Sequence, residues 1–116
     1  MWNSRYFKRI EFACKCGCGD AQINLALLPV LDDVREHFGA PVIVNSGKRC
    51  KKHNQKVGGA QFSKHVLGDA ADIVVRGVAP ADVHAYLVKK YPDRYGIGKY
   101  NSFTHVDVRK GKAARW

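Results

Sequence analysis

Apolar residues in the first half of the chain recur at helical spacing and then form a short continuous run. The recurrence every three or four positions predicts an amphipathic helix built on Leu27, Leu28, Leu31, Val34 and Phe38. Pro29 fits the first turn of this helix, where its missing N–H does no harm, and Gly39 marks a C-terminal stop. The run at 41–47 then predicts a short buried strand that ends in a turn.

The second half of the chain alternates between polar segments and further regular elements. Residues 48–59 are polar and are expected to be helical or irregular. The apolar run at 70–75 predicts a second strand, and residues 80–91 predict an amphipathic helix. Residues 96–109 predict a hairpin with a glycine-rich first arm.

These elements predict the fold class. Strands next to helices, without regular strand–helix–strand alternation, favour an α+β domain with a mainly antiparallel sheet flanked by helices. The chain has 116 residues, no internal repeat and no linker, so we expect a single domain over 1–116. No apolar stretch is long enough to span a membrane.

The polar residues in and before the predicted strands are candidates for a site. In the last strand, His105 and Asp107 are two positions apart and share one face, while the valines between and after them face the core. Asp72 opens the DIVV part of the strand predicted at 70–75, and His65 lies in the preceding loop, which Gly68 allows to fold back.

If that loop curls back, His65, Asp72 and His105 can share one metal ion. Two imidazoles and one carboxylate suit a catalytic Zn²⁺, which takes three protein ligands and leaves its fourth position to water. Such a zinc ion lowers the pKa of the bound water to roughly 7 and polarises a carbonyl. A surface histidine or a strand-edge carboxylate is the alternative for each residue taken alone.

The charge of the chain points to an anionic partner. Twenty Lys and Arg against ten Asp and Glu leave a net charge of +10, which favours nucleic acid, an acidic membrane surface or an anionic cell wall. The basic residues are scattered along the sequence, which argues against a dedicated nucleic-acid tail. The N-terminus lacks the apolar segment of a signal peptide, so we expect synthesis in the cytoplasm and action after release.

The chain has four cysteines. The segment CKCGCG contains Cys14, Cys16 and Cys18, and the fourth is Cys50. In an extended segment, neighbours in this triplet would be poorly placed to bridge each other. A disulfide to Cys50, a structural zinc site with Cys50 and with or without His53, and free buried thiols all remain open.

Four segments together resemble a known family. SKHVLGDAAD matches S-x-H-x-x-G-x-A-x-D, the signature of the zinc D-Ala-D-Ala carboxypeptidase and endopeptidase family, whose members have the hedgehog-type fold. NSGKRCKKHNQKVGGA resembles the segment before that signature, THVDVR resembles the closing histidine motif, and the final ARW resembles the ends of related chains. The similarity runs from about residue 12 to 116. The branch of the family that the chain resembles includes short phage-borne cell-wall hydrolases.

The resemblance implies roles for individual residues. His65, Asp72 and His105 match the three zinc ligands. Arg49 matches an arginine that binds substrate and polarises its carbonyl, as a guanidinium can by donating two hydrogen bonds to one oxyanion or carboxylate. Ser63 either donates to substrate or caps the turn before His65.

The chain departs from the family at the position of the catalytic base. Several branches carry Glu or Asp three residues before the last histidine, but this chain has Ser102 there, and a serine cannot take a proton from water at neutral pH. Asp107 is our candidate base. Its alternative role is to orient an imidazole by accepting its N–H.

The resemblance therefore predicts a zinc metallopeptidase that hydrolyses peptide bonds in bacterial peptidoglycan, as a D,D-carboxypeptidase or an endolysin-like murein endopeptidase. We expect a monomer that the +10 charge holds to the wall. The alternative is a non-catalytic zinc-containing module that binds cell wall or a protein. A nucleic-acid binder built on the cysteines is disfavoured, because it leaves His65, Asp72 and His105 unexplained.

Overall fold

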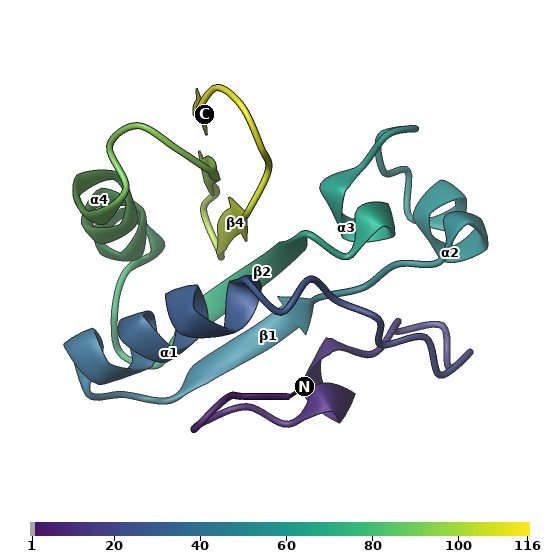
Figure 1. Ribbon diagram of the computed structural model, residues 1–116, viewed down its shortest axis with the longest axis horizontal. Helices are drawn as coiled ribbons and strands as arrows, with labels where there is room; N and C mark the ends of the chain where they lie inside the picture. Colours follow the sequence, from purple (N-terminus) through teal and green to yellow (C-terminus); the bar gives the residue numbers. More distant parts are fainter. Residues whose placement is uncertain (1) are drawn as a thin grey trace.

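A five-stranded sheet forms the centre of the molecule in the computed structural model, which describes residues 2–116 (Figure 1). Its strands are β1 (Val42–Ser46), β2 (Ala70–Val75), β3 (Gly96–Lys99), β4 (Thr104–Asp107) and β5 (Ala114–Arg115). They lie in the order β1-β2-β4-β3-β5, and every neighbouring pair is antiparallel except the parallel pair β3 and β5. The predicted α+β class with a mainly antiparallel sheet is confirmed.

Four helices and one 3-10 turn surround the sheet: η1 (Arg9–Phe12), α1 (Leu27–Phe38), α2 (Lys51–Lys56), α3 (Lys64–Leu67) and α4 (Pro80–Lys90). In Figure 1 the short helices α2 and α3 lie together at the end of the sheet where β1 stops and β2 starts, and α4 lies at the other side. Among residues 2–116, no helix combines the length and the apolar composition needed to cross a membrane.

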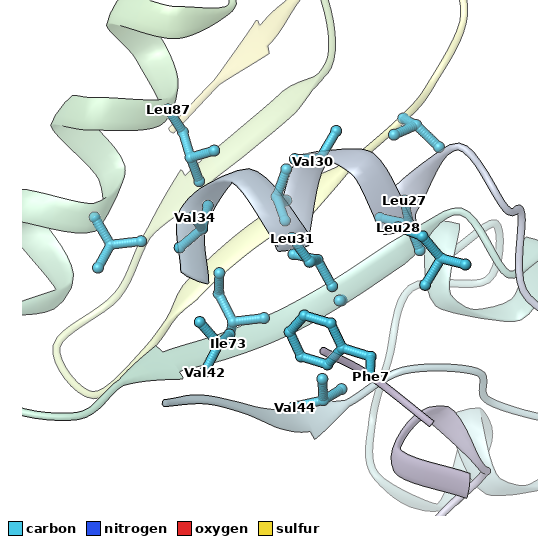
Figure 2. Packing of buried hydrophobic residues seen from close by; sticks show 14 of the residues in the cluster. Phe7, Leu27, Leu28, Val30, Leu31, Val34, Val42, Val44, Ile73 and Leu87 are labelled. Atoms are coloured by element: carbon cyan, nitrogen blue, oxygen red, sulfur yellow. The ribbon is translucent and has the colours of Figure 1, made fainter. Parts of the chain in front are cut away.

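Helix α1 forms where the sequence predicts it. Pro29 occupies its first turn, and Gly39 ends it with a left-handed φ of 60° while its N–H donates to the carbonyl of Arg35. The apolar side chains of α1 pack on the sheet, and Leu87 of α4 joins the same core (Figure 2). One face of the sheet is therefore covered by α1 and α4.

The strand register separates the core face from the opposite face. Ile73 of β2 pairs with Val44 of β1, and Val106 of β4 lies between Ala71 and Ile97. All five side chains belong to the buried core. Because side chains alternate along a strand, the residues between them project to the other face, where the candidate site lies.

The structure also contains features that the hydrophobic pattern did not predict. Strand β1 forms where the short buried strand was predicted, but it is buried on one side only: Val42 and Val44 lie in the core, whereas Ile43 is 45% exposed. The N-terminal segment contributes Phe7 and Phe12 to the core. Figure 2 shows Phe7 among the side chains of α1 and β1.

Candidate metal centre

Two of the predicted ligands face each other across the sheet. Asp72 of β2 lies directly opposite His105 of β4 in the antiparallel register. Both side chains project away from the core, because their neighbours Ile73 and Val106 fill it. The strand pairing thus brings together two residues that are 33 positions apart in the sequence.

The third residue, His65, comes from the one-turn helix α3 just before β2. The hydroxyl of Ser63 caps this turn by accepting the N–H of His65 at 3.1 Å. Gly68 ends it at a φ of 81°, and a Cβ there would lie 2.5 Å from the carbonyl oxygen of Gln22. The loop curls back as predicted, with a short helix inside it, and returns His65 to the start of β2.

One carboxylate oxygen joins the two imidazoles. Oδ1 of Asp72 lies 3.2 Å from Nε2 of His65 and 3.0 Å from Nδ1 of His105. The outer nitrogen of each ring has its own partner: Nδ1 of His65 lies 2.8 Å from the carbonyl of Gly47, and Nε2 of His105 lies 2.8 Å from Oδ2 of Asp107. Each imidazole is therefore held at its outer nitrogen.

This arrangement fits a zinc ion. The ligand atoms of His65, Asp72 and His105 lie within 4.8 Å of one another, and all three residues are buried. When the outer nitrogens donate their N–H groups to Gly47 and Asp107, the inner nitrogens keep free lone pairs directed at the centre. Two neutral imidazoles and one carboxylate are a donor set that zinc prefers in catalytic sites.

Electrostatic coupling keeps the carboxylates of this centre ionised. Burial raises the pKa of Asp72, but hydrogen bonds and charges from His105 and His65 outweigh it and lower the pKa to about 2. Burial also opposes ionisation of Asp107, yet Arg109 and His105 hold its pKa far below the usual range. Burial lowers the pKa of His105, and its two aspartate partners raise it overall.

Arg49 reaches the centre from the segment before α2. Its Nε donates to Oγ of Ser46 at 3.1 Å and its Nη1 to Oδ1 of Asn54 at 3.2 Å. Its Nη2 lies 3.6 Å from Oδ2 of Asp72. These contacts hold the guanidinium beside the carboxylate oxygen that faces away from the histidines.

Asp107 is anchored beneath His105 and is closed off from solvent. Its side chain is 0% exposed, and Arg109 donates to both of its oxygens at 2.7 and 2.8 Å. Gly96 lies opposite Asp107 on β3, where a Cβ would be only 2.4 Å from Oδ2 of the carboxylate. The glycine-rich arm of the hairpin thus leaves room for the Asp107–Arg109 pair.

A cleft of about 430 Å³ opens over the three candidate ligands. One of its walls is aromatic: Tyr100 stacks on Phe103 with ring centroids 4.4 Å apart, and Nε1 of Trp116 donates to the Tyr100 hydroxyl. Among the described residues that line the cleft, Asp72 is the one carboxylate. A larger groove of about 670 Å³ continues from the cleft past Phe62.

The family model for peptidase M15 matches residues 5–107 of the chain, a range that includes all three candidate ligands and Arg49. The chain belongs to the peptidase M15 family. Membership implies the hedgehog-like fold that the sequence motifs predicted. A comparison with curated proteins finds no match to the chain.

The structure of this M15 chain brings together the residues singled out in the sequence. Arg49, Ser63, His65, Asp72 and His105 all line the same cleft. Ser102, at the position where other branches carry a carboxylate, lies exposed in the turn between β3 and β4.

Sequence reasoning missed several partners of these residues. Arg109 continues the alternation of His105 and Asp107, so its place on their face could have been foreseen. Asn54, which holds Arg49, and Trp116, which lies 5.0 Å from the His105 ring, carry no such signal in the pattern.

Proposed function

We propose that this M15 chain is a zinc metallopeptidase that hydrolyses peptide bonds in bacterial peptidoglycan. The observation that carries the proposal is the convergence of His65, Asp72 and His105 on one point, with the outer nitrogen of each imidazole engaged. Membership in a peptidase family supports the reaction type. The D-Ala-D-Ala signature in the sequence supports the substrate class.

Under this proposal His65, Asp72 and His105 hold the zinc ion through Nε2, a carboxylate oxygen and Nδ1. When bound, zinc lowers the pKa of a coordinated water and polarises the carbonyl to be cleaved. The rigidity of the centre comes from the sheet, because two of the three residues are paired across neighbouring strands. Such fixed geometry avoids reorganisation during the reaction.

Arg49 has the role of recognising the substrate oxyanion or a terminal carboxylate. Its side chain is 17% exposed and lines the cleft, and Ser46 and Asn54 fix its guanidinium. A planar guanidinium can donate two parallel hydrogen bonds to one carboxylate, which a lysine cannot do. A D-alanine carboxylate or the carbonyl of the scissile bond is a suitable acceptor.

Asp107 acts through His105 in this proposal. Both of its oxygens are occupied by Arg109, one also by His105, and the carboxylate has no exposed surface. This geometry favours the orienting role over the role of base, since a base must reach the proton that it removes. Asp107 fixes the His105 tautomer and directs Nδ1 toward the centre.

The shape and charge of the protein fit a long anionic polymer. The cleft and the adjoining groove share Gly59, Phe62, Ser63 and Lys64, so an extended peptide stem can run from one into the other. The net charge of +10 would attract anionic wall polymers, and this attraction should weaken as salt is added. Peptidoglycan is therefore the partner that we propose.

The second candidate is a non-catalytic zinc module that binds cell wall or a protein. It is favoured by the position of Ser102 and by the composition of the cleft, whose one described carboxylate is the candidate ligand Asp72. A module of this kind would bind zinc and bind its target without releasing any fragment. Turnover therefore separates the two functions.

The test is digestion of purified peptidoglycan by purified zinc-loaded protein, followed by mass spectrometry of the soluble products. We expect release of stem peptides or of D-alanine, loss of release on chelation, and recovery when zinc is restored. The masses of the products also identify which bond is cleaved.

Two variants control this experiment. Asp72→Asn should abolish release, whereas His53→Ala, which changes a histidine outside the set of ligands, should leave it unchanged. Zinc bound in full at the histidine centre without any release would refute the enzyme and leave the binding module.

A further inference from the structure

The four cysteines, which the proposed function does not use, gather in one cluster next to Arg49. The sulfur atoms of Cys14, Cys16, Cys18 and Cys50 all lie within 4.8 Å of one another. Cys50 directly follows Arg49, whereas the other three lie in the N-terminal turn. The cluster therefore joins two segments that are far apart in the sequence.

The spacing of the sulfurs matches the edges of a zinc–thiolate tetrahedron. Sγ of Cys14 lies 3.4 Å from Sγ of Cys16 and 3.9 Å from Sγ of Cys50, and the latter two sulfurs are 3.7 Å apart. Four sulfurs at a Zn–S distance of about 2.3 Å lie about 3.8 Å from one another. A disulfide needs about 2.05 Å, and all four cysteines are free.

The turn that carries three of these cysteines directs their sulfur atoms toward one another. The N–H of Cys14 donates to the carbonyl of Asp20 at 2.7 Å, which closes the loop, and Gly17 takes a φ of 86° inside it. The segment is therefore not extended, so our expectation of poorly placed neighbours is wrong. Of the three alternatives left open, free buried thiols fit Cys14 alone, because the other three cysteines are not buried.

Backbone N–H groups point at the sulfurs. The N–H of Cys50 lies 3.5 Å from Sγ of Cys14, and the N–H of His53 lies 3.4 Å from Sγ of Cys50. Hydrogen bonds of this kind stabilise sulfur in its thiolate form, which is the form that binds metal. The His53 ring is not part of the cluster, so His53 contributes its backbone alone.

The local charge also suits such a centre. One zinc ion with four thiolates carries a net charge of about −2. Lys15 lies between the first two cysteines of the sequence, and Lys51 and Lys52 follow Cys50. These basic neighbours offset the negative charge of a filled site.

We propose that Cys14, Cys16, Cys18 and Cys50 bind a second zinc ion, which is structural and fastens the N-terminal turn to the segment that carries Arg49. Four thiolates leave no open position for water or substrate, which distinguishes this site from the histidine centre. Soft thiolate ligands select zinc over magnesium or calcium.

The cysteine cluster is linked to the cleft through the backbone of residues 48–50. The N–H of Lys48 donates to the carbonyl of Phe12, its Nζ binds Asp20, and the N–H of Arg49 donates to the carbonyl of His65. Residues 48–50 thus connect the cysteine turn to the α3 turn. A zinc ion at the cysteines holds this connection in place and with it the backbone of Arg49.

The test begins with a metal count on protein purified under reducing conditions. We expect two zinc ions per wild-type chain, one in the Cys14→Ser/Cys50→Ser variant, and one in the His65→Ala/Asp72→Ala variant. Gln22→Ser, a substitution to serine at an exposed position just after the same turn, is the matched control and should retain two. A wild-type chain that binds one zinc ion, lost with His65 and Asp72, would overturn the proposal.

Cobalt substitution identifies the ligands independently of activity. The His65→Ala/Asp72→Ala variant loaded with Co²⁺ should show a thiolate-to-cobalt charge-transfer band and the intense visible bands of tetrahedral cobalt. A spectrum without thiolate charge transfer would contradict the site. Neither the metal count nor this spectrum requires turnover. The proposal of the cysteine site can therefore be refuted while the proposed function stands, and the proposed function can be refuted while the cysteine site stands.

X-ray absorption at the zinc edge covers the case in which a cysteine variant does not fold. Intact wild-type protein should show a sulfur shell at about 2.3 Å together with nitrogen and oxygen at shorter distance. A nitrogen and oxygen shell without sulfur would overturn the proposal with no variant at all.

Discussion

The two candidate metal sites of this protein are built in opposite ways. The histidine centre takes Asp72 and His105 from paired strands, and buried hydrogen bonds hold both imidazoles. The cysteine cluster takes its ligands from a turn and from the start of a short helix, and two of its four cysteines are exposed. Strand pairing and hydrogen bonds hold the residues of the first site without any metal, whereas the second joins a turn to the start of a helix, outside the strands.

This difference suggests a division of work. A centre for chemistry benefits from a rigid frame, because ligands that already stand in place leave the metal free to act on substrate. A structural site adds most where the chain lacks a core, since the free energy of metal binding then becomes folding free energy. Arg49 lies between the two regions and depends on both.

The largest expected effect is the loss of activity in Asp72→Asn. Removal of the carboxylate that joins His65 and His105 eliminates a metal contribution of several kcal/mol, which corresponds to about a thousandfold or more in rate. The melting temperature should change little, because the strands around Asp72 remain paired. Fragment release and thermal unfolding measured on one preparation check both statements, and equal activity in the variant would contradict the assignment.

Arg49→Lys should have the next largest effect, a drop of about a hundredfold in kcat/KM. Lysine keeps the charge but cannot donate two parallel hydrogen bonds, nor hold Ser46 and Asn54 together. The zinc content should stay at the wild-type value, which separates substrate recognition from metal binding. Steady-state kinetics on a defined muropeptide give the comparison, with Lys56→Arg, at an exposed position outside the cleft and the groove, as the control. Retained kcat/KM in Arg49→Lys would exclude the proposed contact.

Asp107→Asn should weaken zinc binding at the histidine centre by about 10- to 100-fold. The asparagine amide can donate to Nε2 of His105, which moves the ring proton to Nδ1 and blocks the lone pair that faces the centre. Competition with a chromophoric chelator measures the affinity. Asp69→Asn, an aspartate that accepts from Asn24 outside the cleft, is the control and should leave affinity unchanged. Unchanged affinity in Asp107→Asn would speak against the orienting role.

The smallest expected effect concerns local order after all metal is stripped. Amide exchange in residues 14–20 and 48–52 should accelerate by about tenfold, while β2 and β4 keep their protection. The contrast follows from the backbone pairing of the strands, which the turn lacks. Exchange measured by mass spectrometry resolves these segments, and equal acceleration in β2 and the turn would remove the distinction between the two regions.

The strand-built site could be predicted from the sequence to a large extent. Alternation along 104–108 places His105 and Asp107 on the face opposite the valines, and the structure keeps that face. Gly68 signals the return of the loop before β2. What the pattern could not supply is the register, which sets Asp72 opposite His105, because pairing depends on the whole sheet.

The loop-built parts escaped prediction for a physical reason. The turn at CKCGCG, which brings the sulfur atoms together, depends on the hydrogen bond from Cys14 to Asp20 and on the positive φ of Gly17. Neither feature produces a hydrophobic period in the sequence. Trp116 follows β5, a strand of two residues that pairs in parallel with β3 and so brings Trp116 to the cleft. A strand of two residues is too short to give a hydrophobic pattern. Short-range patterns carry little information on such contacts.

The central claim is that zinc held by His65, Asp72 and His105 makes this chain a peptidoglycan hydrolase. The most direct measurement adds zinc stepwise to metal-free protein while the release of stem peptides or D-alanine from purified peptidoglycan is followed. Our account predicts that release rises with occupancy of the histidine centre, saturates when that centre is full, and stays flat in Asp72→Asn. Full occupancy of the centre without any release in the wild type would contradict it.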